Sequence, residues 1–178
     1  ANGCVPGDLK YADLDGNNVL DGNDRTTLGS YIPNFTYGIN LGLNYKNLDF
    51  QLTTYGQAGA QMFNRKRALR YSSQNYNFDP SAAALLKPWN VSDQKYSSYF
   101  VESADYFRIQ NITLGYTFRN VKFGNYTMPG LRLSLTADRP FTTFKANAFS
   151  PELSDSQGWD TEVYPLTSTY TLGLKIDF

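Results

Sequence analysis

A run of acidic and amide side chains near the N-terminus could bind a hard metal ion. Between Asp13 and Asp24, side-chain oxygens recur at the spacing of calcium-binding loops, which also use a backbone carbonyl at their seventh position. Counted from Asp13, the predicted ligands are Asp13, Asp15, Asn17, Val19 through its carbonyl, Asp21 and Asp24. We therefore predict a site for a structural Ca²⁺ in this loop.

Two residues depart from the usual calcium-loop pattern. Asn18 stands at the sixth position, where glycine is usual, and Asp24 stands at the last position, where glutamate is usual. Asparagine tolerates the left-handed backbone that the sixth position requires. The alternative is an Asp/Asn/Gly turn held by local hydrogen bonds between side chains and the backbone.

The composition excludes several other kinds of site. The chain has 178 residues, 16 basic and 16 acidic side chains, no histidine and one cysteine. Zero net charge argues against a nucleic-acid-binding protein. Cys4 alone cannot form an internal disulfide or a cluster of cysteine ligands. No apolar leader precedes Cys4, so we expect the N-terminus to be a cut or processed end.

Paired carboxylates could in principle act as a general acid and a general base. The candidate pairs are Glu152 with Asp155 and Asp160 with Glu162. Acidic side chains in a loop between strands are usually solvated, and no feature of the sequence fixes the carboxylate separation that hydrolysis needs. We predict that the chain is not an enzyme. The basic run 64–67 is interpreted as a solvated or salt-bridged loop surface rather than an anion site.

The elements that must position these residues are predicted to be β-strands. Apolar and polar residues alternate with a period of two in segments 35–45, 111–118, 131–138 and 170–178, and more weakly in 48–53. This period is typical of strands and not of helices. The sequence therefore predicts an all-β, antiparallel fold with five strands.

The two faces of these strands differ in a way that favours a membrane-spanning sheet over a soluble sandwich. One face is apolar and ends in aromatic residues, as at a bilayer interface. The other face is rich in Gly, Thr and Asn and includes Arg132, Asp138 and Lys175, which suits a wet lumen. At ~3.3 Å per residue and a tilt of ~45°, segment 35–45 covers roughly 25 Å, the height of an outer-membrane apolar band.

Short and long connections alternate along the chain, as in bacterial outer-membrane barrels. The tight turn at 46–47 and the turn at about 119–130 are predicted to be periplasmic. Residues 1–34 are predicted to be an extracellular loop with the calcium-type motif. Residues 35–178 are predicted to hold five barrel strands with external loops at about 56–105 and 139–165, the first with a helical stretch near 81–86.

Five strands cannot close a membrane barrel, because an open edge in lipid leaves backbone groups unpaired at several kcal/mol each. We therefore expect these to be the last five strands of a larger transmembrane β-barrel. The partners expected from this argument are the remaining strands of the same barrel and outer-membrane lipid.

Four stretches, taken in order, resemble one protein family. They are PGDLKY at 6–11 followed by the acidic loop, PNFTYG at 33–38, YFRIQNITLGY at 106–116 and YTLGL at 170–174. Together they resemble the C-terminal part of the SusC/RagA family. The resemblance implies a TonB-dependent outer-membrane transporter of Bacteroidetes-type bacteria, with a roughly 22-stranded barrel.

The resemblance also implies the partners and the cargo. Members of the family import oligosaccharides or peptides, carry an N-terminal plug, use a SusD-like surface lipoprotein as a lid and receive energy from TonB. The plug and the TonB contact would precede all of the residues present here. Trp89 and Trp159 fall in the predicted external loops and are candidate substrate-binding residues, because indole rings stack on sugar rings. Their burial inside a loop or against the lid is the alternative.

A second interpretation stays open, namely a soluble, calcium-stabilised β-sandwich that serves as a binding module of a secreted carbohydrate-active protein. Such a module would fold in buffer without detergent. It would also bury Ile39, Leu133 and Leu172 beneath a second layer of the same chain, whereas a barrel segment leaves them exposed to lipid.

Overall fold

The computed structural model describes residues 11–70, 97–150, 152, 158–160 and 165–177. Its contacts divide the chain into two compact units. The sheet unit contains Pro33–Gly59, Asp105–Lys145 and Tyr164–Phe178. The loop unit contains Ala1–Ile32, Ala60–Ala104 and Ala146–Val163. The three segments predicted to precede or connect the strands on one side thus gather in a unit of their own.

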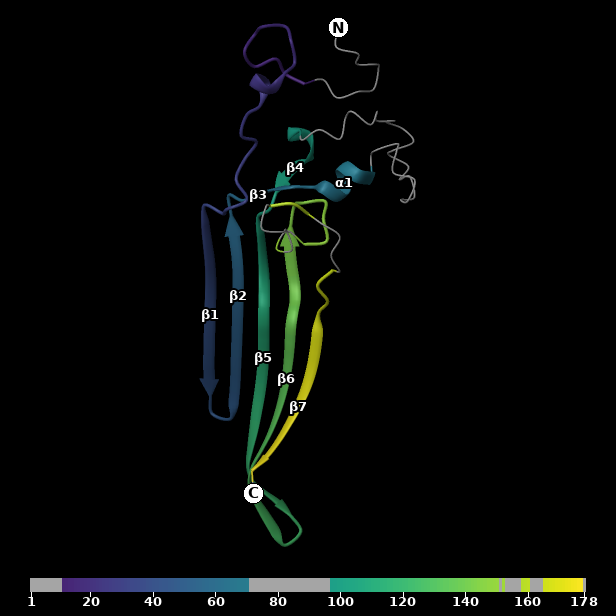
Figure 1. Cartoon of the computed structure of the whole chain (residues 1–178). Helices are drawn as coiled ribbons and strands as arrows, with labels where there is room; N and C mark the ends of the chain where they lie inside the picture. The colour runs from purple at the N-terminus through teal and green to yellow at the C-terminus, as the bar shows by residue number, and fades with distance from the viewer. Residues whose placement is uncertain (1–10, 71–96, 151, 153–157, 161–164, 178) are drawn as a thin grey trace. The chain divides into compact units, whose positions relative to one another are not determined.

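The sheet unit is a single antiparallel sheet with the strand order β1-β2-β5-β6-β7 (Figure 1). The strands are β1 Phe35–Tyr45, β2 Leu48–Ala58, β5 Tyr106–Phe123, β6 Tyr126–Phe144 and β7 Thr169–Asp177. Each pairs with its neighbour in antiparallel register. The predicted antiparallel, all-β fold with five strands is confirmed.

Several strands extend further than the alternation predicted. β2 continues to Ala58, and β6 continues to Phe144 into the predicted loop 139–165. Most of the predicted turn at 119–130 is a β-hairpin, which reverses between Phe123 and Tyr126. In β2 and β6 the alternation ends at β-bulges, which shift the register between Thr53 and Thr54 and around residue 110 and so interrupt the period of two.

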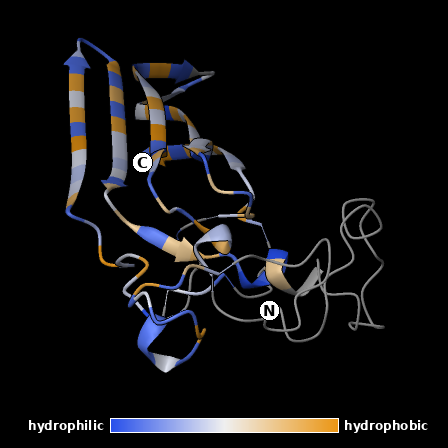
Figure 2. Cartoon of the chain, turned by 90° about the horizontal axis from the view of Figure 1, so that it is seen from above, coloured by the Kyte–Doolittle hydropathy of each residue, from blue (hydrophilic) through white to orange (hydrophobic). Residues whose placement is uncertain are grey.

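One face of the sheet is apolar across all five strands. Residues that pair across neighbouring strands form three complete apolar rows. The rows are Leu41–Leu52–Ile112–Ala137–Tyr170, Leu43–Phe50–Leu114–Leu135–Leu172 and Tyr45–Leu48–Tyr116–Leu133–Leu174. Figure 2 shows the alternation as stripes along β1 and β2. Ile39, Leu133 and Leu172 are 63%, 40% and 78% exposed, so no second layer of the described chain buries this face.

The opposite face carries polar side chains that bond to one another across strands. Arg132 of β6 reaches over β5 to Asp49 of β2, with 2.6 Å between Nη2 and Oδ2. It passes above Gly115, where a Cβ atom would lie 2.5 Å from both partners. Asn111 also donates to Asp138 at 2.7 Å. These bonds satisfy polar groups without any apolar cover.

The loop unit contains short elements. They are η1 Gly22–Asp24, β3 Gln61–Phe63, α1 Arg65–Arg70, η3 Ser98–Phe100 and β4 Val101–Ser103. β3 pairs antiparallel with β4, and Phe63 forms a parallel bridge with Trp159. Met62 and Phe100 are 1% and 2% exposed and form the centre of a small core. The helical stretch predicted near 81–86 lies outside the described residues.

Among the described residues, no helix is both long enough and apolar enough to cross a bilayer.

Candidate functional site

The acidic loop brings three carboxylates together. One oxygen from each of Asp13, Asp15 and Asp24 lies within 4.8 Å of the others. Asp13 and Asp15 are exposed to solvent, and Asp24 is partly covered. Three converging carboxylates offer hard, anionic oxygen ligands, which is the donor set that Ca²⁺ prefers.

Local hydrogen bonds shape this loop. The Asp13 carboxylate accepts from the backbone N–H groups of Gly16 and Asn18, both at 2.7 Å. The Asp24 carboxylate accepts from the N–H groups of Leu14 and Asp21 at 2.7 and 2.8 Å and so joins the two ends of the loop. Asn18 has a φ of 64°, the left-handed backbone expected at the sixth position.

These backbone donors also set the acidity of Asp24. The N–H of Asp21 first, and that of Leu14 second, hold the pKa of Asp24 below its ordinary value. Hydrogen bonds to the charged form favour ionisation. Asp24 is therefore an anion at neutral pH and a competent cation ligand.

The other predicted calcium ligands are used differently. Asp21 caps η1 by accepting from the N–H of Asn23, and its carboxylate does not join the cluster of three. Asn17 donates to Asp15 through its amide and accepts from the N–H of Val19. The hydrogen bonds that the turn interpretation requires are thus present together with the carboxylate cluster, and the calcium assignment remains a prediction.

Trp159 is half-buried in the loop unit. Its ring centroid lies 6.3 Å from that of Phe63, and the guanidinium carbon of Arg65 lies 5.3 Å from the indole centroid. Trp159 also lines a pocket of about 200 Å³ together with Tyr31 and Gln61. Trp159 therefore packs within its own unit and also lines this pocket. Trp89 lies outside the described residues.

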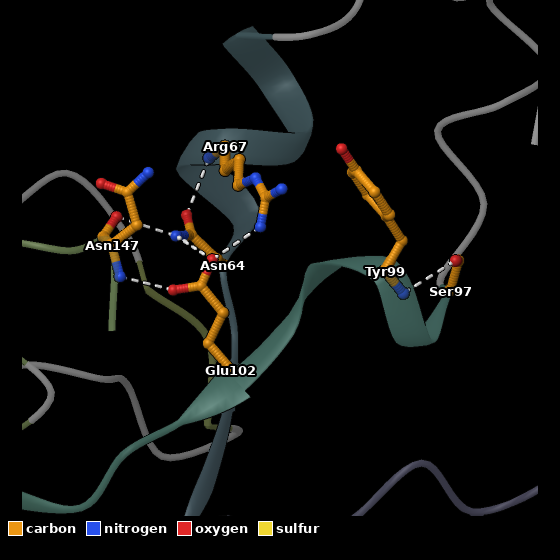
Figure 3. A network of polar contacts seen from close by, with 6 residues as sticks. All are labelled: Asn64, Arg67, Ser97, Tyr99, Glu102 and Asn147. Carbon is orange, nitrogen blue, oxygen red and sulfur yellow. Dashed lines mark hydrogen bonds and ion pairs between the residues drawn. The ribbon is translucent and has the colours of Figure 1, made fainter. Parts of the chain in front are cut away.

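A buried polar network, which the sequence analysis did not identify, joins three segments of the loop unit (Figure 3). Asn64 is 0% exposed, and its amide donates to Glu102 at 3.2 Å and to the carbonyl of Asn147 at 2.9 Å. Its carbonyl accepts from the N–H of Arg67 and caps α1. Glu102 accepts in turn from the N–H of Asn147. No local pattern could reveal residues so far apart in the chain.

The basic run next to this network is occupied by intramolecular contacts. Arg67 pairs with Glu102 at 3.0 Å and stacks over Tyr99 at 4.7 Å. The ammonium of Lys66 lies 3.5 Å from the ring centroid of Phe149. These contacts agree with the prediction of a salt-bridged surface rather than an anion site.

Asp160 is a buried carboxylate beside the same network. It is 2% exposed, and its Oδ2 has no hydrogen-bond partner among the described residues. Burial raises the pKa of Asp160, nearby Lys66 opposes this and nearby Glu102 adds to it. Its suggested catalytic partner Glu162, and Asp155 of the other candidate pair, lie outside the described residues.

Comparison with known proteins identifies what the chain is similar to. It is 28% identical over 177 residues to the TonB-dependent receptor SusC of Bacteroides thetaiotaomicron, an alignment that covers 94% of this chain and 17% of that protein. The TonB-dependent receptor P3 of Formosa agariphila is 27% identical, with coverage of 97% and 19%. The resemblance to the SusC/RagA family is confirmed.

Solved structures of RagAB have a fold that agrees with this resemblance. The solved structure of the RagAB peptide transporter superposes with a TM-score of 0.66 and 24% identity over 84% of this chain and 18% of that chain. RagAB in an open-open state matches with the same TM-score and 22% identity. No protein-family model matches the sequence.

The SusC/RagA-like chain spans less than a fifth of the length of SusC and P3. The relatives are TonB-dependent receptors and transporters, which are not enzymes, in agreement with the prediction that this chain has no catalytic function.

Proposed function

We propose that this chain is the C-terminal wall segment of a TonB-dependent importer in the outer membrane of a Bacteroidetes-type bacterium. The observation that carries the proposal is the set of three apolar rows, which run unbroken across β1, β2, β5, β6 and β7 and most of whose members are exposed. An exposed apolar face of this extent is stable against lipid tails and unfavourable in water.

The roles of the parts follow from the two faces and the loop unit. The apolar face meets outer-membrane lipid, and the polar face with its Asp49–Arg132 pair lines the transport path. The loop unit lies on the extracellular side and contacts the cargo and a SusD-like lipoprotein lid. The remaining strands, the plug and the TonB contact belong to a longer protein, as the short coverage of SusC suggests.

The cargo class within this proposal is oligosaccharides or peptides. RagAB is described as a peptide importer. Trp159 is the described candidate for cargo contact, since it lines a pocket together with Tyr31. Replacing Trp159 with alanine in the full-length protein should weaken uptake of the cargo while leaving the amount of folded barrel unchanged. If the variant and the unmodified protein take up the cargo equally, Trp159 serves only to pack the loop unit.

The acidic loop is proposed to hold a structural Ca²⁺. Asp13, Asp15 and Asp24 would bind it directly, and Asn17, Asp21 and the carbonyl of Val19 would complete the set. The clustered carboxylates and the lowered pKa of Asp24 support this proposal.

Calcium should slow hydrogen exchange in residues 13–24, and Asp24→Asn should abolish that effect. Asp177→Asn, outside the loop, is the matched control. Identical exchange with calcium and with a chelator would favour the simple turn.

The membrane assignment is tested by placing a charge on each face. Leu172 lies in the central apolar row, and its neighbour Thr171 lies on the polar face. Leu172→Lys in the full-length protein should cost about 2–4 kcal/mol and sharply reduce folded protein in the outer-membrane fraction. Thr171→Lys should assemble normally. Equal tolerance of both variants would contradict a lipid-facing sheet.

A further inference from the structure

We propose that the end of the sheet formed by the β1–β2 turn and the β5–β6 hairpin binds the headgroups of anionic phospholipids. This inference rests on the proposed membrane function and adds a lipid preference to it. Under that proposal, this end of the sheet faces the periplasm, where the inner leaflet of the outer membrane presents its headgroups.

The strand pairing brings the two connections to one end of the sheet. Leu48, directly after the β1–β2 turn, pairs with Tyr116 of β5. The hairpin then continues beyond this level, with Arg119 opposite Gly130 and Phe123 opposite Tyr126. Figure 1 shows the turn and the hairpin at the same end, with the hairpin projecting furthest.

This end carries basic groups without acidic partners. Lys46 and Lys122 are exposed, and within the described part of the chain no carboxylate pairs with them. The acidic side chains of neighbouring strands are already engaged, since Asp49 pairs with Arg132 and Asp177 pairs with Lys175. No acidic residue occurs between positions 119 and 130. The two lysines are therefore positive charges at this end of the sheet that no described carboxylate neutralises.

Tyr45 at this end fits an interfacial position. It is 68% exposed and belongs to the last apolar row, and the Lys46 ammonium lies 5.3 Å from its ring centroid. Rings with a polar tip favour the headgroup level of a bilayer. Basic side chains next to them attract anionic lipid.

The dimensions place Lys46 at headgroup level. Lys46 follows Tyr45, which pairs with Leu48 and through it with Tyr116, so it lies directly beyond the last apolar row. Lys122 lies six residues beyond Tyr116, about 20 Å along a strand and roughly 14 Å in depth at a tilt of ~45°. The headgroup layer is about 5–8 Å thick, so Lys122 lies beyond it and acts on the anionic surface over about one Debye length of ~8–10 Å.

The test measures lipid binding by the full-length protein. The protein is purified in neutral detergent micelles, and binding of fluorescent phosphatidylglycerol is followed by energy transfer, with fluorescent phosphatidylcholine as the neutral probe. Phosphatidylglycerol should bind more tightly, and salt should reduce the difference. The variant with both Lys46→Gln and Lys122→Gln should bind it more weakly, by about fivefold for each lysine removed.

The matched control removes two positive charges from the other end of β6, through Arg139→Gln and Lys145→Gln. It should leave phosphatidylglycerol binding unchanged. Equal binding of both lipids, or equal loss in both double variants, would overturn the inference. Slowed hydrogen exchange of residues 119–130 in cells but not in anionic vesicles would also overturn it and would indicate a protein partner. Failure of the unmodified protein to fold in micelles or vesicles would instead count against the proposed membrane function.

Discussion

At the scale of single residues, Asn64 has the largest structural role in the loop unit. Its side chain has two donors and one acceptor, and all three functions are used by atoms of different segments. Because Asn64 is fully buried, water cannot replace any of these bonds. The loop unit therefore depends on a residue that no nearby sequence feature distinguishes.

Asn64→Ala should destabilise the loop unit by about 2–4 kcal/mol, because Glu102 and the carbonyl of Asn147 lose a donor in a buried environment. Hydrogen exchange in residues 97–104 and 145–150 of the full-length protein should become faster. The control is Asn147→Ala, since Asn147 enters the network only through its backbone. Equal exchange in the two variants would show that the network adds little.

Gly115 has a role that a side chain would prevent. A Cβ at this position would lie 2.5 Å from both the Arg132 guanidinium and the Asp49 carboxylate. Gly115→Ala should separate this ion pair and lower the midpoint of thermal unfolding in detergent, at a cost of about 1–3 kcal/mol. Gly42→Ala is the control, because its Cβ would meet nothing within 4 Å. If both variants unfold at the same temperature, the ion pair is dispensable.

At the scale of elements, the period of two predicted β1 with its bounds at Phe35 and Tyr45 and the tight turn after it. The same rule failed where pairing continues without alternation. Asn120 and Pro129 are typical turn residues and are left out of the paired register, yet the hairpin continues past them with Val121 opposite Met128. Regularity of the side chains predicts a strand well, and irregularity does not exclude one.

The candidate sites likewise include one that the sequence predicted and one that it did not. The carboxylate cluster was predictable because Asp13, Asp15 and Asp24 act within one short loop with a known spacing. The Asn64–Glu102–Asn147 network was not, because its members come from three segments that only the folded chain brings together. Asp21 shows a further limit, since its spacing suited a ligand while its carboxylate caps η1.

The acidic loop should lose its order in acid. The pKa of Asp24 is lower in the folded loop than in the unfolded chain, so its contribution is complete above the unfolded value of about 4 and is lost as the pH falls further. Without calcium, hydrogen exchange of residues 14–21, corrected for its intrinsic pH dependence, should become less protected through this range. Asp24→Asn should show weak protection at every pH. A loop whose protection stays constant down to pH 3 would contradict this assignment.

At the scale of the whole molecule, the sheet has two unpaired edges among the described residues. β1 and β7 stand at the ends of the strand order, and each has a neighbour on one side only. Open edges combined with an exposed apolar face favour association with other chains in water. The described sheet therefore has the surface expected of strands that pair with further strands, as the proposed function requires.

The isolated chain should accordingly aggregate when it is refolded in buffer. Detergent micelles should keep it dispersed and allow the sheet amides to become protected from exchange, because the micelle covers the apolar rows. Sedimentation velocity with and without detergent is the measurement, and the full-length protein refolded in the same detergent is the control. A dispersed, protected monomer in plain buffer would support the soluble binding module instead.

The backbone anchoring of Asn147 has a consequence for engineering and for evolution. Asn64 and Glu102 of segment 60–104 bond to the backbone of Asn147 in segment 146–163. A chimaera that replaces 60–104 therefore has to keep both side chains, whereas one that replaces 146–163 keeps these bonds with any residue other than proline at position 147. Side-chain identity at position 147 is free to drift meanwhile, because only main-chain atoms there take part in the tie.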